Sequence, residues 1–245
     1  MAQQLIRFLR KLLGYPPQFS RTDGELTADL SRAFVVAHNA GDHLPASRAA
    51  IDHHADIVEI DLIARGDKLL VAHPRNAWIF SRIGISALDP EEAWAVASAV
   101  PAVKLDLKEA SPQFVRLVLD FLAGREATLT LIVTYSGSVI TEFEHQAPWV
   151  IRSLSVSPQS LARLRDDEPL LRILDGISAA PSTFTSETIS WARDRGLFTM
   201  SSVVNTFAQA DRLLHAGVNG IITDNLALIE AIGHHADTLP LLRPT

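Results

Sequence analysis

The sequence has no cysteine among its 245 residues. This absence excludes a disulfide framework and any metal site built from thiolate ligands. A basic stripe is also missing beyond the N-terminal segment, and the net charge is −6, which argues against a nucleic-acid-binding protein held by phosphate contacts. No short-period repeat or low-complexity tract occurs. What is present, with 47% hydrophobic and 20% charged residues, is the composition of a globular protein with a substantial core.

Short apolar runs alternate with amphipathic segments from residue 34 onward. The runs predicted to be strands are 34–38, 57–62, 103–107, 129–134, 149–154, 171–177, 197–202 and 220–224. Helical patterns lie between them at 45–55, 90–100, 112–124, 158–166, 186–195 and 206–216. This alternation predicts an α/β fold, a parallel TIM (β/α)8 barrel, over residues 25–245. An open doubly wound sheet is the alternative, but the chain lacks a glycine-rich phosphate loop after its first strand.

Residues 1–24 are predicted to form an N-terminal amphipathic helix and a linker. Arg7, Arg10 and Lys11 interrupt the apolar residues, so we expect neither a secretion signal nor a membrane span. We therefore expect a cytoplasmic location. The apolar face of this helix would cover the bottom of the barrel or a neighbouring subunit. The alternative is peripheral membrane contact through residues 5–13.

A further apolar run, residues 68–74, follows the second strand after the turn ARGD. We expect it to pair with the continuation of that strand as a hairpin, or else to form an extended loop above the barrel mouth. Both arrangements bring His73 to the face of the barrel where the strands end.

Polar residues recur where the predicted strands end. Glu59 and Asp61 alternate with apolar residues in VEIDL, so both carboxylates leave the strand on the same side. The others are His38 in the first strand, Asp106 and Lys108 in the third, and Thr223, Asp224 and Asn225 in the last. Barrel enzymes place their chemistry at the carboxyl ends of strands, so we expect a functional site there.

Glu59, Asp61 and Asp106 would form a cluster of oxygen ligands, for which Mg²⁺ or Ca²⁺ is the expected ion. Two alternatives stay open. Glu59 and Asp61 would instead form salt bridges inside the barrel, or Asp106 and Lys108 would be an internal ion pair.

His38 and His73 would flank a substrate as general acid and base, because imidazole can give and take a proton near neutral pH. Lys108, an ammonium beside the metal, would bind an anionic group. A metal, a lysine and two histidines suit the cleavage of a phosphodiester.

Several stretches together resemble the glycerophosphodiester phosphodiesterase family. AHNAG and ADIVEIDLIARGDKLLVAHP match the family's first histidine, its Glu-x-Asp pair and its second histidine. KLDLK corresponds to its acidic-x-Lys strand and AGVNGIITDN to its closing segment. The resemblance spans about residues 34–230, and it implies a TIM barrel, a divalent metal and hydrolysis of lipid-derived phosphodiesters, with glycerophosphodiesters or lysophospholipids as substrates.

The sequence departs from the family pattern at four positions. Asn39 stands where the family has a phosphate-binding arginine, and Ala46 where it has a glutamate. Asp106 replaces the usual glutamate in an Asp-Leu-Lys form closer to the sphingomyelinase D-like branch, and Ser202 replaces an aromatic residue that would pack against the alcohol group. Asn39, Lys108 and Asn225 are the residues we expect to bind substrate. Capping of the last helix is an equal alternative for Asn225.

Two other functions remain as alternatives. One is a catalytically degenerate barrel that binds a lipid or phosphate ligand. The other is a lyase or aldolase with a Schiff base on Lys108, a role that three nearby carboxylates disfavour because they raise the pKa of the amine. The oligomeric state is left open, and a nucleic-acid partner is not expected.

Overall fold

The computed structural model describes residue 28, residues 33–73 and residues 87–233. The predicted N-terminal helix and linker, residues 1–24, lie outside this part of the chain, and so does the predicted membrane-contact segment within them. Among the described residues, no helix is both long enough and apolar enough to cross a bilayer.

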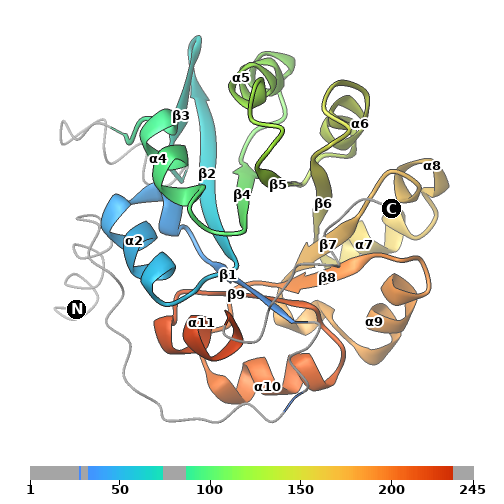
Figure 1. Cartoon of the computed structure of the whole chain (residues 1–245). Helices are drawn as coiled ribbons and strands as arrows, with labels where there is room; N and C mark the ends of the chain where they lie inside the picture. Colours follow the sequence, from blue (N-terminus) through green and yellow to red (C-terminus); the bar gives the residue numbers. More distant parts are fainter. Residues whose placement is uncertain (1–27, 29–32, 74–86, 234–245) are drawn as a thin grey trace, which may run out of the picture.

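A closed barrel of parallel strands forms the centre of the molecule (Figure 1). Its strands are β1 (Phe34–Ala37), β2 (Ile57–Arg65), β4 (Ala102–Leu107), β5 (Leu129–Thr134), β6 (Ile151–Val156), β7 (Gly176–Ala179), β8 (Phe198–Ser201) and β9 (Gly220–Thr223). Each strand pairs with the next in this order, and β1 pairs with both β9 and β2, which closes the ring. The predicted TIM (β/α)8 barrel is confirmed, and the open sheet is excluded.

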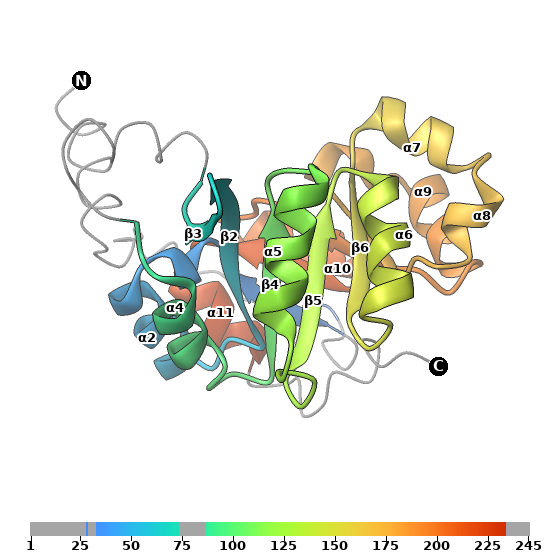
Figure 2. The same ribbon diagram turned by 90° about the horizontal axis from the view of Figure 1, so that it is seen from above.

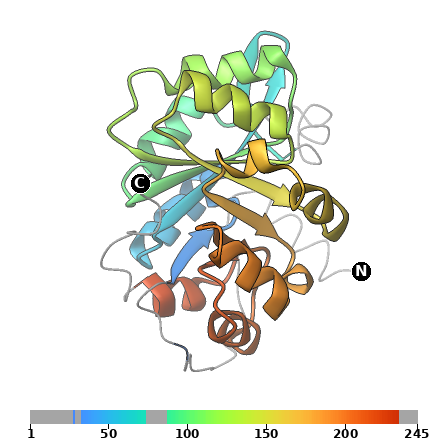
Figure 3. The same ribbon diagram turned by 90° about the vertical axis from the view of Figure 1, so that its right-hand side faces the viewer.

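Helices surround the barrel on its outside (Figures 1 and 3). They are η1 (Ala40–Asp42), α2 (Leu44–Asp52), α4 (Pro90–Ala97), α5 (Pro112–Leu122), α6 (Gly137–Gln146), α7 (Pro158–Leu164), α8 (Glu168–Leu171), η2 (Pro181–Thr183), α9 (Ser186–Arg193), α10 (Phe207–His215) and α11 (Leu226–Gly233). Figure 2 shows α5 and α6 lying over β4, β5 and β6. Several helices begin at a capping residue, such as Ser111 before α5, whose hydroxyl accepts a hydrogen bond from the Phe114 amide at 3.2 Å.

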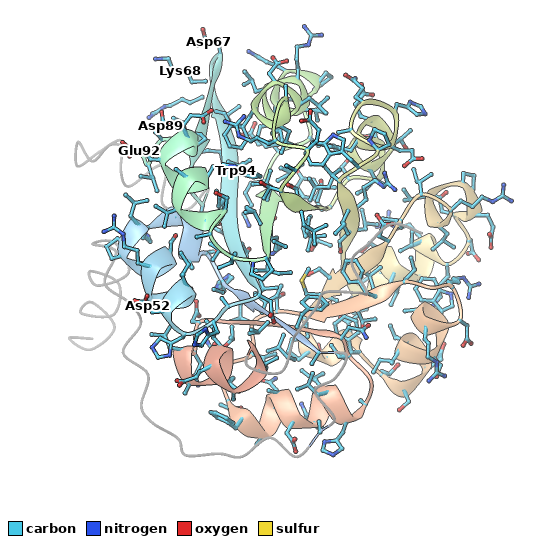
Figure 4. All side chains as sticks on the ribbon, viewed as in Figure 1. Asp52, Asp67, Lys68, Asp89, Glu92 and Trp94 are labelled. Carbon is cyan, nitrogen blue, oxygen red and sulfur yellow. The ribbon has the colours of Figure 1, made fainter. Side chains whose placement is uncertain are left out.

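The run at 68–74 forms a hairpin with the second strand, as one of the two alternatives predicted. Strand β3 (Lys68–Val71) pairs antiparallel with the outer part of β2, from Leu62 opposite Val71 to Arg65 opposite Lys68. The hairpin projects beyond the barrel, with the exposed Asp67 and Lys68 at its tip (Figure 4). Because of this extension, Glu59 and Asp61 lie within β2 and not at its end.

The prediction for residues 171–177 was wrong over most of that range. Residues 168–171 are the short helix α8, and β7 begins only at Gly176. Leu171, at the end of the helix, and Leu174, in the following loop, are both buried. A short apolar run was therefore not sufficient to indicate a strand. Helix α6 was not predicted either, although Val139, Ile140 and Phe143 form its buried face.

Apolar side chains fill one part of the barrel interior. The cluster comprises Phe34, Val36, Ile57, Ala102, Leu131, Val133, Ile151, Phe198, Met200 and Ile222. A Cβ on Gly220 would lie 2.4 Å from the Phe34 ring, so glycine is needed there to let that ring lie inside. Side chains two residues apart in a strand point to the same face. Glu59 and Lys104, which follow Ile57 and Ala102 at this spacing, therefore also face the interior.

Candidate functional site

The polar residues come together where four neighbouring strands approach the barrel mouth. Strand β2 lies between β1 and β4, and β1 also pairs with β9. The residues concerned are His38 directly after β1, Glu59 and Asp61 in β2, Asp106 in β4, Lys108 just beyond β4, and Asp224 directly after β9. Residues far apart in the sequence thus share one side of the mouth.

Strand β4 and the residue that follows it place two lysines, Lys104 and Lys108, beside the carboxylates of β2. The register sets Glu59 beside Lys104 and Asp61 beside Asp106. Lys104 Nζ lies 2.8 Å from Glu59 Oε1 and 3.5 Å from Asp106 Oδ2. Lys108 Nζ lies 2.9 Å from Asp61 Oδ1 and 2.8 Å from Asp106 Oδ2. We call these five residues the charge cluster. It contains the ion pairs that were considered as alternatives to a metal site.

Lys104 was not among the predicted site residues. Its side chain is only 2% exposed and is completely enclosed by the barrel. Burial lowers the pKa of Lys104, but the charges of Glu59 and Asp106 more than offset this, so its pKa is raised and the ammonium form is favoured. The alternation in KLDLK could have predicted it, because Lys104, Asp106 and Lys108 occupy every second position and so point to the same face of a strand.

Asp42 is a second site residue that the sequence reasoning missed. Its Oδ1 atom accepts a hydrogen bond from the Asp61 amide at 2.9 Å, and the residue is buried in η1. Gly41 makes this approach feasible, because a Cβ there would meet Glu59 O at 2.7 Å and Ile60 Cγ1 at 2.3 Å. The close contact of η1 with β2 thus adds a fourth carboxyl group beside the charge cluster.

Burial and neighbouring charges shift the pKa values of the carboxyl groups at this site in different directions. Burial raises the pKa of Asp61 to about 7, the Glu59 charge adds to this, and Lys108 opposes it. Burial and the charge of Asp61 raise the pKa of Asp42 well above its usual range. Burial also raises the pKa of Asp106, but the charges of Lys104 and Lys108 outweigh this and bring it down to about 2. Without an ion, Asp42 therefore favours its protonated, neutral form, and Asp61 loses its proton only near neutral pH.

The donor set fits a hard divalent cation. Glu59, Asp61 and Asp106 each offer a carboxylate oxygen, and these oxygens lie within 4.8 Å of one another. Glu59 Oε2 and Asp61 Oδ2 are buried and have no hydrogen-bond partner among the described residues. The three carboxyl groups of the charge cluster face two ammonium groups, and the charge of a divalent ion would favour the ionised form of Asp61 as a ligand.

His38 belongs to a separate hydrogen-bonded chain at the same mouth. Its Nδ1 atom lies 2.8 Å from Asp224 Oδ1. Asn205 Nδ2 donates to Asp224 Oδ2 at 3.2 Å, and Asn205 Oδ1 accepts from the Asp224 amide at 2.8 Å. Burial lowers the pKa of His38, but the hydrogen bond to Asp224 and the charge of Glu59 raise it above its ordinary value. The carboxylate thus fixes the ring and stabilises its protonated form.

The hairpin carries His73 toward the same region. The Ala72 amide donates to the carbonyl oxygen of Asp61 at 3.0 Å, so His73 follows directly after a residue bonded to the charge cluster. A catalytic role for His73 remains a prediction that this backbone position supports.

The other two predicted substrate-binding residues have different surroundings. Asn39 has left-handed backbone angles, with φ of 50°, and its buried Oδ1 has no hydrogen-bond partner among the described residues. Asn225 Oδ1 accepts from the Ala227 amide at 3.0 Å, and its Nδ2 donates to the Asn205 carbonyl at 3.1 Å. The contact with the Ala227 amide is the helix-capping geometry weighed for Asn225, and substrate binding by either residue stays a prediction.

Comparison with solved structures finds many related barrels. An Oleispira antarctica phosphodiesterase in complex with the product sn-glycerol-3-phosphate has a TM-score of 0.68 and 17% identity, covering 84% of this chain and 97% of that one. A glycerophosphodiester phosphodiesterase from Parabacteroides distasonis has a TM-score of 0.64 and 17% identity, with coverages of 84% and 99%. One from Thermotoga maritima has a TM-score of 0.61 and 13% identity, with coverages of 80% and 96%.

Sequence comparisons give no match of this kind. No protein-family model matches the chain, and no curated protein does. The structural likeness, at such low identity, extends over four fifths or more of the chain. The chain therefore has the TIM-barrel fold found in glycerophosphodiester phosphodiesterase structures.

Proposed function

We propose that the protein is a metal-dependent phosphoric diester hydrolase of the glycerophosphodiester phosphodiesterase type. The observation that carries this proposal is the convergence of Glu59, Asp61 and Asp106 beside Lys108 and His38 at the mouth of the barrel. A solved neighbour of the same fold holds sn-glycerol-3-phosphate, the product of such a reaction. The motifs around His38 and Glu59 independently resemble that family.

Glu59, Asp61 and Asp106 would hold the divalent ion, Mg²⁺ or Ca²⁺. Such an ion supplies Lewis-acid polarisation of a phosphoryl oxygen. The Lys108 ammonium, 17% exposed at the rim of the charge cluster, would attract the phosphate and offset the charge that develops on its oxygens.

His38 and His73 would share the proton transfers. One imidazole accepts the proton of the attacking hydroxyl while a new bond forms from that oxygen to phosphorus. The other donates a proton to the alkoxide released as the original ester bond breaks. The Asp224 hydrogen bond at Nδ1 of His38 leaves Nε2 as the nitrogen that exchanges protons with substrate. If the attacking hydroxyl belongs to the substrate, the product is a cyclic phosphate; if it is water, the product is a phosphomonoester.

The organic part of the substrate would contact the other side of the mouth. Among the described residues, the exposed large hydrophobic side chains are Tyr135, 62% exposed just after β5, and Val203, 38% exposed just after β8. An apolar contact at this rim suits a glycerophosphodiester or a lysophospholipid-like substrate.

A ligand-binding barrel without catalysis is the second candidate. It is favoured by the ion pairs of Lys104 and Lys108, which compensate part of the acidic cluster without a metal. It is also favoured by Asn39, which stands where the related family has a phosphate-binding arginine. A peripheral membrane contact through residues 5–13 and a cytoplasmic location would fit both candidates and remain predictions.

The direct test is an activity screen with glycerophosphodiesters and lysophospholipids in the presence of Mg²⁺ or Ca²⁺. Phosphorus NMR of the products would separate a monoester from a cyclic phosphate. We expect turnover with at least one substrate and loss of turnover in chelator. Saturable binding of the same compounds without turnover, under both ions, would favour the ligand-binding barrel.

A further inference from the structure

Lys104 contacts two of the three carboxylates that would bind the metal. Its Nζ lies 2.8 Å from Glu59 Oε1 and 3.5 Å from Asp106 Oδ2. Asp106 follows Lys104 two positions later in β4, and Lys108 follows two positions after that, just beyond the strand, so Lys104 lies one layer deeper in the barrel. At 2% exposure it cannot serve as a phosphate contact, unlike Lys108 at 17%.

A buried ammonium in this position has two opposite effects. It holds one oxygen of Glu59 and compensates carboxylates that would otherwise repel one another in the barrel interior. It also places a fixed positive charge beside the oxygens that a divalent ion would use, and like charges at such a distance repel strongly when water is excluded. The same contacts that stabilise the metal-free cluster therefore oppose metal binding.

We propose that Lys104 is an affinity-setting residue, an internal cation that keeps the charge cluster folded without metal and weakens its affinity for a divalent ion. This inference rests on the metal site of the proposed function. Because Glu59 Oε2 and Asp61 Oδ2 remain without hydrogen-bond partners among the described residues, the ion and the ammonium would share the cluster and not exclude each other completely.

Replacement of Lys104 by a neutral residue tests the inference. Lys104→Met retains most of the volume, and Lys104→Gln retains an amide donor for Glu59, which keeps the proposal testable if the methionine variant fails to fold. Lys68→Met, at the exposed tip of the hairpin in Figure 4, is the matched control for removal of one positive charge. Chelator-treated proteins would be titrated calorimetrically with Mg²⁺ and Ca²⁺, and their thermal unfolding measured with and without each ion.

We expect the Lys104 variants to bind the preferred ion at least about tenfold more tightly than the unmodified protein. They should also be less stable without the ion and gain more stability from it, since the ion then compensates Glu59. The Lys68 variant should behave like the parent. Equal or weaker ion binding by the Lys104 variants, with normal binding by the parent, would overturn this inference alone. No ion binding by any of the proteins would contradict the metal site itself, and this inference with it.

Discussion

His38 and Asp224 lie 186 positions apart in the sequence, yet the Nδ1 atom of the histidine is 2.8 Å from the carboxylate of the aspartate. The closure of the barrel between β1 and β9 produces this contact, because each residue directly follows one of these paired strands. A carboxylate at Nδ1 orients the ring and favours its protonated form. The pair thus has the arrangement expected of an oriented acid–base group.

Replacing Asp224 by asparagine should lower kcat by about tenfold or more, because the ring loses its charged partner. The pKa of His38 should fall, since the Asp224 hydrogen bond and charge both raise it. NMR titration of the histidine together with a pH–rate profile would measure both effects. Asp67→Asn, on the exposed hairpin tip, is the control. An unchanged His38 pKa in Asp224→Asn would contradict the orienting role.

Alanine at His38 or at His73 should reduce turnover by about two decades or more with the fold retained, given the usual size of general acid–base effects. Steady-state kinetics with circular dichroism would check each variant. His215→Ala, at the exposed end of α10, should have normal activity. Near-normal turnover in either of the two active-site variants would remove that histidine from the mechanism.

Asp56 should make the fold less stable as the pH rises. Burial raises its pKa to about 7 against the opposing hydrogen bond from the Val35 amide, so the folded protein holds a proton that the unfolded chain releases near pH 4. Its contribution to stability is therefore greatest below pH 4 and is lost as the pH rises to about 7.

The Asp56→Asn variant can still accept the Val35 hydrogen bond, which is 2.8 Å long in the parent. We expect it to be more stable than the parent at pH 8 by about 1–3 kcal/mol, with a smaller advantage at pH 5. Urea unfolding at several pH values would measure this difference, with the exposed Asp120→Asn as control. A stability difference that does not change with pH would rule out the protonation of Asp56.

An alanine at Gly41 should push η1 away from β2, because its Cβ would meet backbone and side-chain atoms of Glu59 and Ile60. A loss of about 1–3 kcal/mol in the free energy of unfolding is expected, typical of overpacking. Gly137→Ala is the comparison, since there the added carbon meets only the flexible Leu170 side chain at 2.9 Å. If the two variants were equally stable, the close packing of η1 on β2 would not be the reason for this glycine.

The alternation of apolar runs and amphipathic segments was sufficient to predict the barrel, and VEIDL was sufficient to place Glu59 and Asp61 on one face. What failed was local. The apolar run at 171–177 was predicted to be a strand. Its apolar residues Leu171 and Leu174 are indeed buried, but Leu171 belongs to a helix and Leu174 to a loop.

Sequence patterns do not show which side chains from segments far apart in the sequence come into contact. The partnership of Lys104 with Glu59 depends on the register between β2 and β4, and that of Asn205 with Asp224 depends on the loop after β8. The two-residue alternation that identified Asp106 also includes Lys104. It was missed because burying a lysine without a charged partner costs much free energy, and the sequence does not show which partners it has.

The central claim is that Glu59, Asp61 and Asp106 hold a divalent ion. Calorimetric titration of chelator-treated protein with Mg²⁺ and Ca²⁺, beside the double variant Glu59→Gln, Asp61→Asn, tests it most directly. Saturable binding by the parent that disappears in a folded double variant is the predicted result. An absence of binding by the parent, or equal binding by both proteins, would show that these carboxylates serve only the ion pairs with Lys104 and Lys108.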